Sequence, residues 1–109
     1  MAIYTNLVAD QGTNFDARVQ LQSADGNNID LTGYTVSSFI KKSFNSSTSY
    51  GFNASIVNLT GVVGLSLSAA ETAAMKPGRY VFDVVISTQS GTRTRVLEGQ
   101  LEILAGVTP

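Results

Sequence analysis

Apolar side chains alternate with polar ones, at a period of two residues, in several separate segments of this chain. The alternation is clearest where Tyr80, Phe82 and Val84 follow one another at every second position. Clusters of Gly, Asn, Asp, Ser and Thr separate these segments, for example DGNN at 25–28 and TQSGT at 88–92. With the opening YTNLV counted as a short edge strand, this spacing predicts about seven strands in an all-β antiparallel sandwich or barrel.

One stretch, SAAETAAMKPG, departs from the alternation. Ser68 precedes a run rich in alanine, and Glu71 stands three positions after it, which is the spacing of a helix capping box. Pro77 and Gly78 cannot continue a helix. We therefore expect one short helix over 69–76, which needs tertiary packing to be stable and connects two strands of the fold.

The composition limits the kinds of partner and chemistry. The chain has 109 residues, seven basic against eight acidic side chains, no cysteine and no histidine. We expect a single domain over 1–109, without disulfides, whose weak net charge favours neither a nucleic-acid nor a membrane partner. The first residues lack the pattern of a signal peptide, so synthesis and folding in a cytosol are expected, without secretion.

The same composition argues against an enzyme. Histidine, the commonest general base, and cysteine, the thiol nucleophile, are both missing, so we assign no catalytic residue and expect no cofactor and no small-molecule ligand. Asp25 and Asp30 flank a turn rich in oxygen donors that could bind calcium. Their order departs from that of an EF-hand loop, so a turn without metal is the preferred interpretation, and a calcium-dependent adhesive domain remains an alternative.

Several exposed features are candidates for contact with a partner. Arg93 and Arg95 flank Thr94 on one strand face, where they either pair with acidic groups of a partner or, as we prefer, solvate a strand edge. Tyr4 is a further candidate, in an aromatic platform for protein or sugar. The expected contact segments are an N-terminal arm over 2–11, the loop SFNSSTS at 43–49 and a C-terminal tail over 105–109.

Two runs, DLTGYTV at 30–36 and KPGRYVFDV at 76–84, resemble a family of small immunoglobulin-like virion proteins of tailed bacteriophages, including marine phages and cyanophages. The chain is more distantly similar to the N-terminal domain of phage baseplate upper proteins. The resemblance spans nearly the whole chain and implies an immunoglobulin-like sandwich. In such a fold Tyr80 takes the place of the tyrosine-corner residue, Phe82 stands where antibody domains have a cysteine, and Asp30 caps the turn that Gly33 allows.

The resemblance also implies a function. It indicates a non-enzymatic structural protein of the virion, either a capsid decoration protein or a component of the tail, neck or baseplate. Its expected partners are other virion proteins and copies of itself in a homo-oligomer. A carbohydrate-binding module or an adhesive β-sandwich of the same architecture is the alternative.

Overall fold

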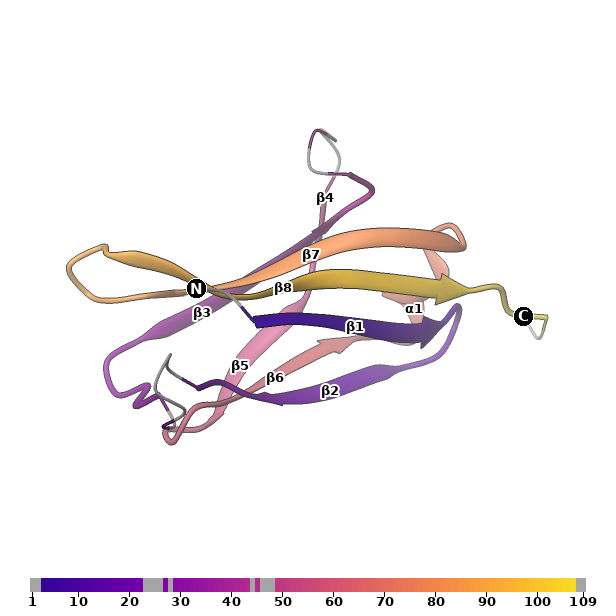
Figure 1. Cartoon of the computed structure of the whole chain (residues 1–109). Helices are drawn as coiled ribbons and strands as arrows, with labels where there is room; N and C mark the ends of the chain where they lie inside the picture. The colour runs from indigo at the N-terminus through magenta and orange to yellow at the C-terminus, as the bar shows by residue number, and fades with distance from the viewer. Residues whose placement is uncertain (1–2, 23–26, 28, 44, 46–48, 108–109) are drawn as a thin grey trace.

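Two β-sheets pack face to face in this computed structural model, which describes residues 3–22, 27, 29–43, 45 and 49–107 (Figure 1). The elements are β1 (Ile3–Asp10), β2 (Phe15–Gln20), β3 (Thr35–Lys41), β4 (Ser49–Gly51), β5 (Asn53–Asn58), β6 (Val62–Leu67), α1 (Ala69–Ala73), β7 (Gly78–Ser87) and β8 (Arg93–Leu104). One sheet has five strands in the order β1-β8-β7-β3-β4, and the other has three in the order β2-β6-β5. The predicted all-β sandwich is confirmed.

The strands differ from the expected set in two respects. Eight strands are present in the described residues, because the alternating segment at 50–56 divides at Phe52. β4 lies in the five-stranded sheet and β5 in the three-stranded sheet, so the chain changes sheets at this residue. The pairing is antiparallel throughout except between β1 and β8, which run parallel.

The core lies between the sheets and uses the apolar positions of each alternating segment. Val63 and Leu65 of β6 and Val84 of β7 have no solvent exposure. The Phe52 ring lies edge-on to that of Phe82, with ring centres 5.6 Å apart. Because Phe52 stands at the change of sheet and Phe82 on the central strand β7, this ring contact joins the two layers.

α1 connects β6 of one sheet to β7 of the other, as a crossover. The capping box is present: the Ser68 hydroxyl accepts from the Glu71 backbone N–H, and the Glu71 carboxylate accepts from the Ser68 backbone N–H. The helix ends at Ala73, three residues before the expected end at residue 76. After it the turn tightens, since the Met75 N–H donates to the Thr72 carbonyl three residues back, and Met75 is 1% exposed in the core.

The N-terminal end of the chain is less free than the contact segment that we expected there. The described part of the arm over 2–11 is an integral strand, since all of β1 pairs with β8 from Ile3 to Asp10. The Gln11 N–H extends this pairing by donating to the Leu104 carbonyl. Ala105–Val107 follow β8 outside any strand and are exposed.

Candidate interaction surface

The side of the five-stranded sheet that faces away from the three-stranded sheet is called the outer face below. The strand register brings its side chains into rows across the sheet. One row contains Tyr4, Glu98, Asp83 and Phe39, from β1, β8, β7 and β3 in turn. Tyr4 is 59% exposed and Phe39 is 55% exposed. Two exposed rings therefore stand at opposite ends of the row, with two carboxylates between them.

Further apolar groups share the outer face with these rings. Val8 lies beside Glu102, and Leu104 lies beside Asp10, at the other end of the β1–β8 pair. Four of the seven large apolar side chains that the described residues leave exposed thus belong to this face: Tyr4, Val8, Phe39 and Leu104. Isolated exposed apolar residues are normal, but a set gathered on one sheet face is typical of a protein-contact surface.

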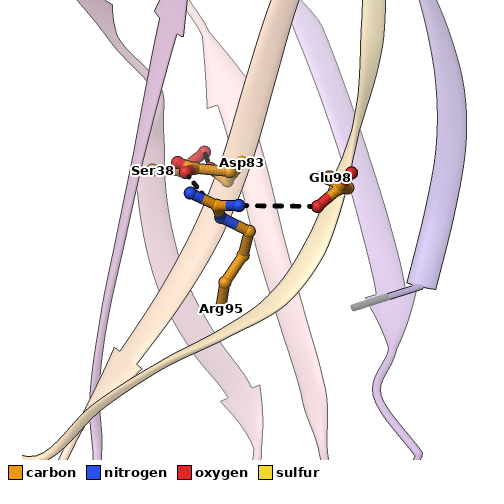
Figure 2. Close-up of polar contacts among 4 residues, drawn as sticks. All are labelled: Ser38, Asp83, Arg95 and Glu98. Carbon is orange, nitrogen blue, oxygen red and sulfur yellow. Dashed lines mark hydrogen bonds and ion pairs between the residues drawn. The ribbon is translucent and has the colours of Figure 1, made fainter. Parts of the chain in front are cut away.

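An ion-pair cluster occupies the middle of the face (Figure 2). The Arg95 Nε is 3.2 Å from the Asp83 Oδ2, and its Nη1 is 3.7 Å from the Glu98 Oε2. Asp83 and Glu98 stand directly opposite each other, an arrangement of like charges that destabilises a strand pair. The guanidinium between them offsets this repulsion, although solvent screening leaves each exposed pair worth little by itself.

A β-bulge places Arg95 in this cluster. The register between β7 and β8 shifts at Val84 and Val85, which pair with Leu97 and Arg95 respectively. Val96 is left over, and both it and Leu97 are buried. Because the bulge changes the alternation of β8, Arg95 lies on the same face as Glu98.

The hydroxyl of Ser38 fixes the neighbouring backbone from the buried side of the sheet. It donates a hydrogen bond to the Asp83 main-chain carbonyl (Figure 2). A shallow, open hollow lies beside the cluster and is lined by Phe39, Lys41, Val81 and Arg95, among others. A broad surface with mixed apolar and charged lining suits contact with another protein better than enclosure of a small molecule.

The structure places the three expected contact residues differently. Tyr4 and Arg95 lie on the outer face, but Arg95 is engaged with Asp83 and Glu98 inside the chain. Arg93 lies at the start of β8, opposite Ser87, and is exposed. The interpretation of these arginines as residues of a strand edge holds only in part. β8 lies between β7 and β1, so it is not an edge strand, but its pairing with β1 begins only at Leu97, after both arginines.

Sequence reasoning did not single out Asp83, Glu98, Val8 or Phe39 as surface residues. The signal for Phe39 was present, because it stands on the opposite face from Tyr34 and Ile40 in its alternating segment. For the acidic pair the alternation indicates only which face each carboxylate lies on, not that the two meet. Asp83 and Glu98 become neighbours only through the register of β7 and β8.

The residues assigned structural positions form turns and packing contacts. The Tyr80 hydroxyl donates to the Lys76 carbonyl at 2.7 Å, which is the bond of a tyrosine corner. Gly78, next to Pro77, has a φ of +141° at the start of β7. Phe82 is 3% exposed.

The Asp30 turn is held by two hydrogen bonds to one carboxylate oxygen. Asp30 Oδ1 accepts from the Thr32 hydroxyl at 2.7 Å and from its backbone N–H at 2.9 Å, and Gly33 follows with a φ of +81°. The bonds from the Thr32 hydroxyl and backbone lower the pKa of Asp30.

The turn considered for calcium falls only partly within the described residues. Asp25, the other acidic residue of the calcium interpretation, lies outside the described residues, as do 44 and 46–48 of the SFNSSTS loop. Within the described ranges no three His, Cys, Asp or Glu side chains gather in a group that could hold a metal ion. None of the helices found there is both long enough and apolar enough to span a membrane.

Comparison with known proteins identifies a fold without a family. No protein-family model and no curated protein matches the sequence. Among solved structures, the chain is similar to the Lin-41 filamin domain, with 18% identity over 91% of this chain and 84% of that chain and a TM-score of 0.52. It also resembles a chain from a structural study of T cell activation by the superantigen toxic shock syndrome toxin-1 (13% identity, 91% and 92% coverage, TM-score 0.45).

A third similar structure is a family 123 glycoside hydrolase from Clostridium perfringens. The identity is 14%, the match covers 97% of this chain and 24% of that chain, and the TM-score is 0.43. At such identities the filamin-domain likeness shows the immunoglobulin-like sandwich fold alone, and the two lower TM-scores add nothing to it. The comparisons and the structure together establish an immunoglobulin-like β-sandwich.

Proposed function

We propose that this chain is a non-enzymatic structural protein of a tailed-bacteriophage particle. It binds other virion proteins and copies of itself through the outer face of the five-stranded sheet. The gathering of exposed apolar side chains on that face carries the proposal of protein binding. The resemblance of the runs at 30–36 and 76–84 to phage virion proteins supports the location in a virion, as either a capsid decoration or a tail, neck or baseplate component.

The chemistry of the face favours assembly on physical grounds. Burial of Tyr4, Val8 and Phe39 against a partner would remove apolar surface from water. The face also carries charged side chains, among them Asp83 and Glu98, whose desolvation opposes binding. Arg95 neutralises much of the charge of these two neighbours, which lowers that cost.

Binding to particles tests the proposal directly. Purified protein is mixed with phage particles that lack it, and the bound fraction is measured by co-sedimentation and located by electron microscopy. We expect regular attachment, and we expect Phe39→Lys to weaken it by about ten-fold or more, because it places a hydrated charge in the apolar part of the face.

Val57→Lys is the matched control, since Val57 is similarly exposed but belongs to β5 of the other sheet. Thermal unfolding checks that both variants are folded. Absence of binding between the wild-type protein and the particles contradicts the virion assignment. Equal loss of binding in both variants contradicts the assignment to the outer face.

The two exposed rings favour one other candidate, a carbohydrate-binding module. Tyr4 and Phe39 are three strand spacings apart in one row, or about 14 Å, a span that suits an extended oligosaccharide. Saturable quenching of tyrosine fluorescence by a glycan, abolished by Tyr4→Ala, is expected from this function. A protein that attaches to particles without such quenching excludes it.

A further inference from the structure

The open edge of β1 differs from the other sheet edges of the molecule. An exposed edge strand offers unpaired backbone groups to other strands, and proteins protect such edges by short length, charges or bulges. The other edges carry these protections. β4 has three residues, β5 is interrupted by a register shift after Ile56, and β2 carries Asp16 and Arg18.

β1 has none of these protections along most of its length. The strand has eight residues, and from Ile3 to Ala9 it contains no charged residue, no proline and no glycine. Its register with β8 is continuous. In the described part of the chain no strand pairs with its other side, because β2 belongs to the opposite sheet (Figure 1).

The main-chain groups on that open side can be assigned from the pairing with β8. The Thr5 carbonyl lies against Gly99, and the Gln11 N–H donates to Leu104, so odd-numbered residues direct their backbone groups towards β8. Backbone groups alternate in direction along a strand. Tyr4, Asn6 and Val8 therefore present their N–H and C=O groups on the open side.

We propose that two copies of this chain join through β1, in an antiparallel pair about a two-fold axis at Asn6. The two five-stranded sheets then form one continuous sheet. The inference deepens the proposed assembly function, on which it rests, by naming a second copy as the partner and β1 as the contact.

The axis position follows from the side chains that each arrangement brings together. With the axis at Asn6, Tyr4 stands beside Val8 of the second copy, twice, and Asn6 stands beside its own equivalent. Aromatic pairs with β-branched residues stabilise such contacts, and Asp10 falls outside the paired segment. An axis at Leu7 would instead place Asp10 beside Tyr4 and Asn6 beside Val8. Of these two arrangements, only the first pairs apolar with apolar and polar with polar, and it opposes no like charges.

This contact is small, so the free dimer is expected to be weak and to dissociate on dilution. On a particle, neighbouring copies are held at high effective concentration, which compensates for the weak affinity. Pairing also joins the two outer faces, so that two Tyr4–Val8 pairs flank the central Asn6 pair on one continuous face. A self-contact through β1 therefore enlarges the surface available to other virion proteins.

Opposite charges placed at Asn6 test the arrangement. Asn6→Lys and Asn6→Glu each put two like charges together at the axis, so each variant alone should dimerise about ten-fold more weakly than the wild type, or worse. When the two variants are mixed, Lys faces Glu, and heterodimers should form at least as well as the wild-type dimer. Sedimentation equilibrium over a range of concentrations measures the affinity, with one variant isotopically labelled so that native mass spectrometry identifies the heterodimer.

Ser55→Lys and Ser55→Glu are the matched controls, because Ser55 is an exposed residue of the edge strand β5. These variants should dimerise like the wild type, and circular dichroism checks that every variant is folded. A wild-type protein that stays monomeric even at about millimolar concentration, Asn6 variants that dimerise normally, or a mixture without recovery would each overturn the inference. Wild-type protein that attaches to particles while remaining monomeric overturns the β1 pairing and leaves the proposed function intact. A dimer that dissociates on dilution as expected but does not bind particles supports the β1 pairing and contradicts the proposed virion function.

Discussion

Tyr80 shows how much structure one side chain organises in this chain. Its ring is buried, lies edge-on to the Tyr50 ring at 6.0 Å, and has the Lys42 ammonium 4.7 Å from its centre. Its hydroxyl donates to the Lys76 carbonyl, in the connection between α1 and β7. Burial, with a smaller contribution from Tyr50, raises the pKa of Tyr80 above its ordinary value of 10.0. The protonated Tyr80 hydroxyl thus anchors the crossover that contains α1 to strand β7.

Tyr80→Phe should lower the free energy of unfolding at pH 7 by about 1 kcal/mol, because the Lys76 carbonyl loses its donor. Because the pKa of Tyr80 is raised in the folded state, the stabilising contribution of its protonated hydroxyl is complete below pH 10.0, the ordinary pKa. This contribution is lost as the pH rises through the higher pKa of the folded state. The difference in the free energy of unfolding between the wild type and Tyr80→Phe should therefore become smaller above pH 10.0. Urea unfolding at neutral and alkaline pH measures both effects, and equal stability at pH 7 would show that the hydrogen bond contributes nothing.

Individual residues were predictable from sequence where local geometry decides their position. Tyr80 follows Pro77 and Gly78 at the fixed spacing of a corner, and Asp30 precedes Gly33 in a turn. The Asp83–Arg95 contact was not predictable. It depends on a register and a bulge between strands, which no local pattern specifies.

At the scale of elements, the parallel pair of β1 and β8 depends on one glycine. Gly99 stands opposite Thr5 in the register and is buried. A Cβ atom at this position would collide with the Thr5 backbone. The absence of a side chain at residue 99 therefore lets β1 approach closely enough to pair.

Gly99→Ala should displace β1 from β8 and lower the free energy of unfolding by about 1–3 kcal/mol, the usual cost of overpacking. Hydrogen exchange should show faster exchange at the amides of Thr5 and Leu7, which face β8. Gly51→Ala is the control, because a Cβ there meets only the Phe39 ring at an ordinary contact distance of 3.9 Å. Unchanged exchange in β1 would mean that the two strands can separate slightly without losing their hydrogen bonds.

Elements were predictable wherever the local sequence carries its own start and stop signals. The capping box at Ser68 and Glu71 fixed the start of α1, whereas nothing in the local pattern placed its end at Ala73, three residues before the expected end. The change of sheet at Phe52 was not predictable either. The alternation continues unbroken through residues 50–56 and does not record which sheet each half joins.

The whole molecule depends on contacts that cross between the two sheets. Apolar alternation predicts which side of each strand is buried, and so it predicts a sandwich, but it leaves the order and direction of strands open. β1 lies parallel to the last strand, and no short connection in the sequence specifies that pairing. The contacts that bind the layers must therefore be tested as tertiary interactions.

The Phe52–Phe82 pair is the clearest of these contacts, and a double-mutant cycle measures its coupling. Phe52→Leu and Phe82→Leu should each lower the free energy of unfolding by about 1–2 kcal/mol, out of a total of roughly 5–15 kcal/mol for a domain of this kind. Together they should cost less than the sum, by about 0.5–1.5 kcal/mol, because the edge-on ring interaction can be lost only once.

Phe39→Leu combined with Phe82→Leu provides the control, because Phe39 lies on the outer face, away from the ring contact between the layers. That pair should be additive. Strict additivity at Phe52 and Phe82 as well would mean that apolar burial alone holds the layers together. A measured coupling assigns part of the stability to this one contact, at the point where the chain passes from one sheet to the other.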